Sequence, residues 1–387
     1  MGRQARQELI KRLEKDRDGR LLIAYVTSTR TGFEISIADD ILPLLREHLE
    51  KAPDKAKHGV DLFIHSNGGS GTVPWRVVNL IREYTDKFAV LVPHRAFSAA
   101  TLIALGADEI IMHRMGCLGP IDPSVANVFN PPHPYNPALP APISVEDVSA
   151  YFKLVKEEVG ISHEDELVQA LIALTEKIHP LALGNVQRSH NQSRMLAQKL
   201  LRKHMSVESQ HEIETIIDTL KSNLFFHGHP INRKEARDDL KLKVVDPSPV
   251  AEQVMWELYA EYEGALKLKE PFTPIHEIDV AQRGAPTPPT VQELVQKIRE
   301  LSAAGVQLVP GGEEQVVRLA AAMVNVLGRV APKTRLEKLP GAYLESVDHT
   351  DVFLTDMAIE RATINTPAGP QDAVKQEVLW QRWELET

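Results

Sequence analysis

Short apolar segments alternate with helical patterns through the first 112 residues, and this alternation restricts the possible folds more than any other feature of the sequence. The apolar segments are Leu21–Val26, Val60–Ile64, Phe88–Val92 and Glu109–Met112. Between them, apolar residues recur at helical spacing, as in residues 41–49 and 75–84. Continuous apolar strands that alternate with helices are typical of a mostly parallel sheet covered on both faces. We therefore predict an α/β fold.

Two turns follow neighbouring strands of this sheet. Gly68 and Gly69 come after the strand 60–64, and Ser98 stands between the strand 88–92 and an apolar helix pattern. Both turns fall at the carboxyl ends of parallel strands, the edge where sites form. A serine at such an elbow exposes its Oγ beside backbone N–H groups that can stabilise an oxyanion. The ordinary alternative is that Ser98 only caps the helix that follows it.

Several motifs together resemble the ClpP/crotonase superfold of serine peptidases, and more closely its serine dehydrogenase proteinase family. The matching segments are His65–Gly69, Val92–Met112, Leu118–Pro123, His179–Val186 and His227–Ile231. The resemblance spans about residues 5–265. The superfold also includes signal peptide peptidase A. It implies a ClpP/crotonase-like sheet with helices on both faces and a serine endopeptidase that forms an acyl-enzyme on Ser98. It also implies an oxyanion hole from the backbone N–H groups of Gly69 and Ala99, with Gly68 as a further donor.

The general base that would serve Ser98 is not fixed by the sequence. ClpP carries a catalytic histidine in the segment that corresponds to Gly119–Pro123, and this chain has none there. Asp122 in that segment is either an active-site residue or a turn residue. Lys153 matches the spacing of the lysine base of signal peptide peptidase A, and its ordinary alternative is a solvated surface lysine.

His227 and His229 are the third set of candidates. When Glu235 and Ala236 are aligned with the closing helix of ClpP, these histidines fall where ClpP places its catalytic aspartate. Histidine is the usual base at neutral pH. A metal interpretation of the His-Gly-His motif lacks a third and a fourth ligand nearby, so we predict neither a metal nor a cofactor.

The remaining sequence predicts additions to a peptidase domain at residues 1–265. A proline-rich loop is expected at residues 124–145 and a helical region at 145–222. A proline-rich linker covers 266–289. Residues 290–387 read as a separate C-terminal appendage, with helices at 291–301 and 314–327, that would bind a partner or support oligomer formation.

Composition excludes several classes of protein. The net charge of −9 argues against nucleic acid as a partner. A single cysteine, Cys117, allows no intrachain disulfide and fits a reducing compartment. No apolar segment has the length of a membrane span or of a signal-peptide core, so we predict a cytoplasmic location.

Three functions are compatible with these features. The first is a homo-oligomeric serine peptidase that acts on protein or peptide substrates. The second is a catalytically inactive ClpP-like scaffold whose C-terminal module binds a partner, an alternative motivated by the missing ClpP histidine. The third is a crotonase-type acyl-CoA enzyme, which shares the fold and the oxyanion hole but needs no nucleophilic Ser98.

Overall fold

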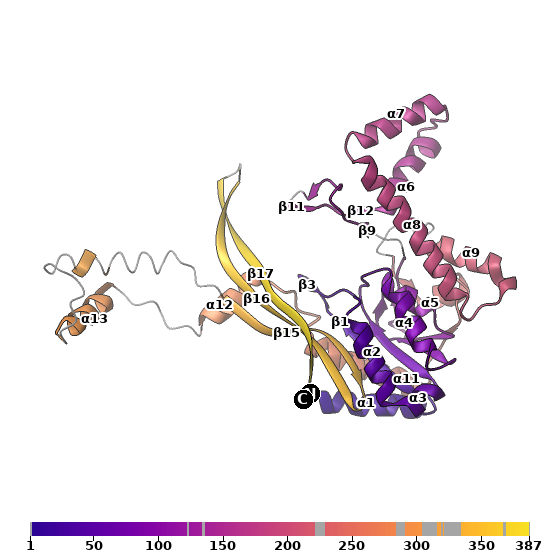
Figure 1. Ribbon diagram of the computed structural model, residues 1–387, viewed down its shortest axis with the longest axis horizontal. Coiled ribbons are helices and arrows are strands. Elements are labelled where there is room, and N and C mark those ends of the chain that lie inside the picture. Colours follow the sequence, from indigo (N-terminus) through magenta and orange to yellow (C-terminus); the bar gives the residue numbers. More distant parts are fainter. Residues whose placement is uncertain are drawn as a thin grey trace. The chain divides into compact units, whose positions relative to one another are not determined.

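A computed structural model gives the fold (Figure 1). It describes residues 2–121, 124–133, 136–220, 229–283, 291–303, 316–318, 320, 334–366 and 369–386. The chain divides into two compact units. The first comprises Met1–Glu270, Pro340–Phe353 and Trp383–Thr387, and the second comprises Pro271–Leu339 and Leu354–Arg382.

The first unit is built on a parallel sheet, as the alternation of apolar segments predicts. Its parallel strands, in spatial order, are β14 (Val244–Val245), β7 (Glu109–Met112), β5 (Phe88–Val92), β4 (Val60–His65) and β1 (Leu21–Thr27). Every residue of β1, β4 and β5 is buried, because helices cover both faces. The prediction of a mostly parallel α/β fold is confirmed.

Alternate residues of each strand face different helices. Leu21, Ile23 and Tyr25 of β1 belong to a core that includes apolar residues of α2, α4 and α5. Phe63 of β4 points to the opposite face, where its ring lies 6.3 Å from that of Tyr262. The helices are α1 (Arg3–Asp16), α2 (Ile41–Lys51), α3 (Pro53–His58), α4 (Val73–Arg82), α5 (Ala99–Leu105) and α11 (Pro249–Ala265).

The C-terminal residues complete the same sheet. β15 (Thr334–Ser346) pairs antiparallel with β1, with Ala24 opposite Glu345 and Thr27 opposite Ala342. The sheet then continues into β16 (His349–Thr366) and β17 (Gly369–Leu385). We expected residues 290–387 to form a separate appendage, but they are divided between the two units because this pairing holds part of them in the first.

Two helices of the second unit fall within the segments that we expected to be a linker and an appendage. These are α12 (Pro274–Arg283) and α13 (Val291–Ala303). The helix predicted over 291–301 is thus present, whereas most of the one predicted over 314–327 lies outside the described residues. The predicted linker 266–289 is partly helical, because α12 begins at Pro274, a residue whose fixed φ suits the first turn of a helix.

A helical region follows the Ser98 segment, as predicted. Its helices are α6 (Val145–Lys153), α7 (Glu164–Thr175), α8 (Pro180–Leu201) and α9 (Gln210–Asp218), with a π-helical turn at Leu154–Glu158. The proline-rich segment before it is less irregular than expected. Its short strands are β9 (Ser124–Val125), β10 (Pro132–His133), β11 (Asn136–Pro140) and β12 (Ile143–Ser144), which form two small ladders. Prolines are tolerated there because such strands are edges.

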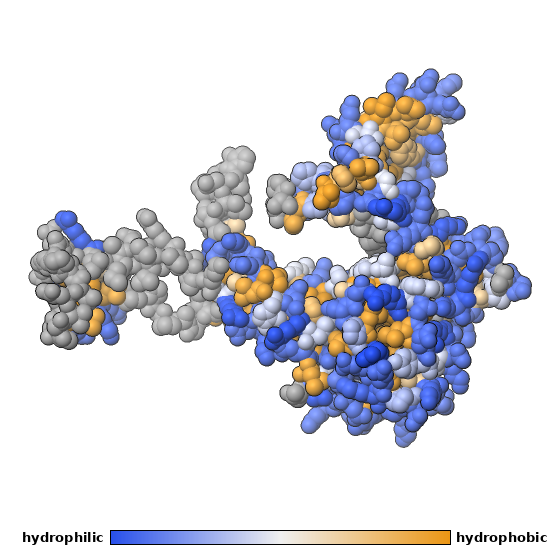
Figure 2. All heavy atoms as spheres, in the orientation of Figure 1, coloured by the Kyte–Doolittle hydropathy of each residue, from blue (hydrophilic) through white to orange (hydrophobic). Residues whose placement is uncertain are grey.

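Figure 2 shows apolar side chains exposed around α7. We call this set the apolar face of α7, although only three of its members lie on α7 itself; the others lie in or just after the π-helical turn and at the start of α8. Its members are Leu154, Val159, Val168, Leu171, Ile172 and Leu181, each more than 40% exposed. Among the described helices, none is long and apolar enough to span a membrane.

Candidate active site

Ser98 occupies a strained turn between β6 (Arg95–Ala96) and α5. Its φ of 51° and ψ of −112° lie in a region that residues with a side chain rarely adopt, and such strain is concentrated at functional sites. Its Oγ makes no capping hydrogen bond to α5, and we find no partner for it among the described residues. The half-buried hydroxyl of Ser98 is therefore available to a ligand.

The Gly68–Gly69 turn lies directly against this elbow. A Cβ atom on Gly68 would stand 2.8 Å from both the carbonyl oxygen of Phe97 and the Cβ of Ser98. The contact is fixed by backbone hydrogen bonds: the Phe97 N–H donates to the Ser66 carbonyl at 3.0 Å. Glycine is required at this position because only a residue without Cβ fits, and because its φ is 108°.

The backbone N–H groups around Ser98 differ in their availability. The Gly68 N–H donates to Ser66 Oγ at 3.0 Å and is therefore occupied. For the N–H groups of Gly69 and Ala99, no acceptor is found among the described residues. Ala99 is the first residue of α5, where N–H groups have no partner within the helix. Gly69 and Ala99 thus keep two donors beside the Ser98 hydroxyl.

Ser98 opens into a cavity of about 320 Å³. Its walls come from the turn after β4, from α5 and from α8, and are formed by Gly69–Thr72, Ser98, Leu102, Ile121, Ser189, Gln192, Ser193 and Leu196. Ser193 Oγ donates to the Ile121 carbonyl at 2.6 Å and so ties α8 to this wall. Sequence reasoning did not place α8 at the site. Among the described lining residues there is no histidine or lysine.

His229 is the described base candidate that the strand register brings toward Ser98. In a small sheet of β6, β8 (Cys117–Leu118) and β13 (Ile231–Asn232), Ala96 pairs with Leu118 and Leu118 with Ile231. Because β13 is antiparallel to its neighbour, Ser98 and His229 both lie two residues beyond this row in the same direction. Extended beyond the strand ends, two strand spacings would place them about 10 Å apart. His229 is not among the described residues of the Ser98 cavity wall, and catalytic hydrogen bonds often form only with substrate bound.

A carboxylate orients His229. Its Nε2 lies 2.8 Å from Oε1 of Glu235, on α10 (Arg233–Asp238). Both side chains are partly exposed, at 31% and 20%. An imidazole held by a carboxylate is the arrangement that general-base histidines have in serine peptidases. Glu235 was not among the residues that the sequence singled out for catalysis.

The other base candidates are placed less favourably or lie outside the described residues. Lys153 is exposed at the end of α6, whereas lysine bases are desolvated. Like His229, it is not among the described residues of the Ser98 cavity wall. Asp122 and His227 lie outside the described residues. The roles of Asp122 and His227 therefore stay predictions, although Asp122 directly follows Ile121, which lines the cavity.

Three histidines follow three adjacent parallel strands, a pattern that the sequence analysis did not use. His65, His94 and His113 stand at the carboxyl ends of β4, β5 and β7. The rings of His65 and His94 are stacked, with centroids 5.5 Å apart. Tyr259 Oη shares a 3.1 Å hydrogen bond with His94 Nδ1. A histidine at the end of each strand was the available signal.

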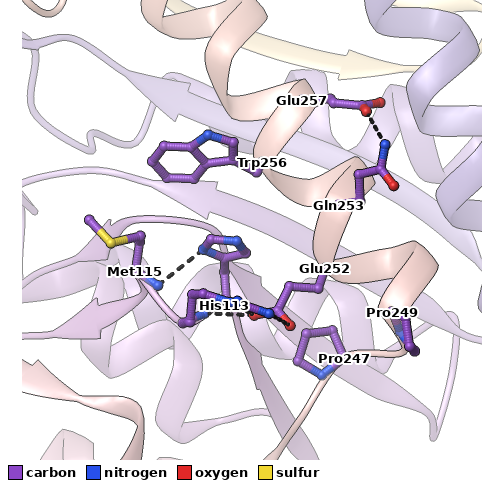
Figure 3. A pocket seen from close by; sticks show the side chains of 9 residues that line it. His113, Met115, Pro247, Pro249, Glu252, Gln253, Trp256 and Glu257 are labelled. Atoms are coloured by element: carbon purple, nitrogen blue, oxygen red, sulfur yellow. Dashed lines mark hydrogen bonds and ion pairs between the residues drawn. The ribbon is translucent and has the colours of Figure 1, made fainter.

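A second cavity, of about 630 Å³, adjoins His113 (Figure 3). The His113 ring stacks on Trp256 of α11, and its Nδ1 accepts a 3.0 Å hydrogen bond from the Met115 N–H. Glu252 binds the Arg114 guanidinium, whose hydrogen bond lowers the pKa of Glu252 to about 2. Ser98 is not among the described residues that line this second cavity. The ion pair between Arg114 and Glu252 is structural, because it fixes the turn after β7 to α11.

The histidine row predicts a fold that is sensitive to acid. Burial lowers the pKa of His65 well below its ordinary value, and the charges of His94 and Arg95 lower it further. The unfolded chain therefore binds more protons than the folded protein below about pH 6.5. The free energy of unfolding should fall with decreasing pH there, by up to about 1.4 kcal/mol per pH unit for His65.

Urea unfolding at about pH 7.5 and about pH 5.5 measures this dependence. The variant His65→Asn has no titratable group at this position. The number of protons that the unfolded chain binds in excess of the folded protein should therefore be smaller by about one. An unchanged pH dependence in this variant would contradict the assignment to His65.

Comparisons with known proteins find similarity to one family of serine proteinases. The sequence model of ClpP-like SDH-type serine proteinases matches residues 2–133. An uncharacterized protein of Methanocaldococcus jannaschii is 28% identical over 227 residues, 59% of this chain and 65% of the relative. A second uncharacterized protein of that organism is 36% identical over 91 residues, 24% of this chain and 29% of the relative. The chain thus spans less than two thirds of these relatives.

A solved structure of the 1510-N membrane-bound stomatin-specific protease, in a serine-to-alanine mutant form, is also similar to the chain. The identity is 13% and the TM-score 0.35, over 59% of this chain and 81% of the other. The family match is the stronger finding, because its residues 2–133 include β1, β4, β5, β7 and the Ser98 elbow. Through these residues the chain is similar to the ClpP-like SDH-type serine proteinases, whose model covers about a third of its length.

Proposed function

We propose that the protein is a serine endopeptidase in which Ser98 forms the acyl-enzyme. The observation that carries this proposal is the strained elbow, where the Ser98 hydroxyl lies against Gly68 and beside the N–H groups of Gly69 and Ala99. None of these three groups has a hydrogen-bond partner among the described residues. A helix cap needs neither the strain nor the open cavity. The family supports the reaction class, and the geometry of the described residues supports the role of each group.

In the proposed mechanism, Ser98 Oγ attacks the carbonyl carbon of a peptide bond while its proton passes to Nδ1 of His229. The negative oxygen of the tetrahedral intermediate accepts hydrogen bonds from the N–H groups of Gly69 and Ala99. Glu235 holds Nε2 of the imidazolium. The imidazolium then protonates the leaving amine, and a water molecule hydrolyses the ester on Ser98 with His229 again as the base.

Covalent labelling with a fluorophosphonate tests the nucleophile. The wild-type chain should be labelled once, and Ser98→Ala should not be labelled at all, because the reagent needs an activated hydroxyl beside an oxyanion hole. Ser189→Ala is the matched control, since Ser189 lines the same cavity from α8 but stands on a regular helix. It should be labelled like the wild type.

Absence of labelling in the wild type, whatever its oligomeric state, would contradict the peptidase and favour the inactive scaffold. Capture on immobilised coenzyme A would then distinguish the crotonase-type enzyme, which binds the coenzyme without a serine nucleophile. Labelling that persists in Ser98→Ala would place the nucleophile elsewhere.

The finer properties of the protein are part of the same proposal. We propose protein or peptide substrates and a homo-oligomer, and the apolar face of α7 supports a subunit contact because six large side chains are exposed there. We propose partner binding for the part of residues 290–387 that belongs to the second unit. A cytoplasmic location is supported by the single, unpaired Cys117.

A further inference from the structure

A cluster of two histidines and one aspartate is buried between α2 and β16, outside the Ser98 cavity. His48 is 0% exposed, His349 7% and Asp351 4%. His349 and Asp351 are two residues apart on β16 and therefore share a face of that strand. All three residues belong to the first unit. We propose that His48, His349 and Asp351 bind a divalent transition-metal ion, for which Zn²⁺ is the best match.

The distances between the ligand atoms fit a tetrahedral ion. Asp351 Oδ2 lies 3.2 Å from His48 Nε2 and 3.2 Å from His349 Nε2, and the three ligand atoms lie within 4.8 Å of one another. Bonds of about 2.0–2.1 Å around Zn²⁺ place adjacent ligands about 3.3 Å apart. An ion therefore fits between the three atoms with little movement, and a water molecule would take the fourth position.

The surroundings suit a metal ligand set. Ser346 Oγ lies 2.8 Å from His48 Nδ1, a hydrogen bond that fixes the ring and leaves Nε2 to face Asp351. Two imidazoles and one carboxylate are a donor set that zinc commonly takes.

Lys51 is the cation that competes for this site. Its Nζ lies 2.8 Å from His349 Nδ1 and 2.9 Å from Nε2. The residue is exposed, so its flexible side chain can swing into solvent when an ion binds. Removing this ammonium should leave zinc binding intact or make it tighter, whereas a purely structural hydrogen-bond cluster would gain no metal affinity.

Zinc titration of the metal-stripped full chain tests the proposal, with a chromophoric chelator as competitor. We expect one Zn²⁺ per chain in the micromolar range or tighter. Each of the variants His48→Gln, His349→Gln and Asp351→Asn should weaken binding by about 100-fold or more. His58→Gln, an exposed histidine on the neighbouring α3, is the control and should bind like the wild type. Lys51→Met should bind equally or more tightly.

Cobalt substitution gives a readout that does not depend on the folding of any variant. Wild-type protein with bound Co²⁺ should show the intense visible bands of a tetrahedral site, and X-ray absorption of the zinc form should report two imidazoles. The proposal fails if the wild type binds no zinc in this range, or if the three ligand variants bind it as the wild type does. Fluorophosphonate labelling is a separate measurement, so this outcome leaves the proposed peptidase untouched.

Discussion

The variant His229→Gln is expected to react with a fluorophosphonate at least about 100-fold more slowly than the wild type, because a positioned general base contributes about 10²–10⁴-fold to the reaction of a serine. Glutamine keeps a hydrogen-bond donor for Glu235 but cannot take a proton. Glu235→Gln should have a smaller effect, since it removes only the group that orients the imidazole. Stopped-time labelling of the folded variants gives the rates.

Three further variants make this experiment decisive among the base candidates. His211→Gln changes an exposed histidine of α9 and should label at the wild-type rate. His227→Gln and Lys153→Met test the remaining predictions from the sequence. A wild-type rate for His229→Gln together with a silent Lys153→Met would overturn the assignment and make the site a serine–lysine dyad.

The second large effect is expected on stability. Arg6→Met should lower the free energy of unfolding by about 3–5 kcal/mol, because it leaves a buried carboxylate without its cation. Arg6 Nε binds Glu345 Oε2 at 2.6 Å, and the Glu345 side chain is 0% exposed. The Arg6 guanidinium also lies 4.6 Å from the centre of the Tyr343 ring. Denaturant unfolding measures the change.

A matched control lies on the same helix. Arg12 forms an ion pair with Glu257 in which both side chains are about 40% exposed, so Arg12→Met should cost less than about 1 kcal/mol. The double variant Arg6→Met, Glu345→Gln should be more stable than Arg6→Met alone, because it removes the unpaired charge. Equal effects of Arg6→Met and Arg12→Met would show that burial of the pair is not what makes it important.

The parallel half of the sheet and the position of the Ser98 elbow could be predicted from the sequence because their signals are local. Buried strands read as apolar runs, and the Gly68–Gly69 turn and Ser98 follow two of them directly. Lys241, shortly before β14, has a φ of 56°, a conformation that favours glycine and that its sequence does not indicate. The family model matches residues 2–133, which include these strands, the Gly68–Gly69 turn and Ser98.

The remaining features depend on contacts that no local pattern records. β15 pairs with β1 although more than 300 positions separate them, and the strands β15 to β17 were read as an appendage because their pattern gives no partner. The wall that α8 adds to the Ser98 cavity requires the packing of an inserted helix against α5. His48 and Asp351, which lie 303 positions apart, could not be associated before the fold was known.

The pairing of β1 with β15 makes the order of synthesis important. During translation β1, β4, β5 and β7 can assemble early, but the outer edge of β1 has no partner until residue 346 has left the ribosome. An unpaired apolar edge strand is a template for intermolecular association. Arg6 likewise has no Glu345 to pair with until then. A nascent or truncated chain that ends before β15 would therefore be prone to association through β1 and would need chaperones. Residues 334–346 are thus required to protect the first strand of the protein.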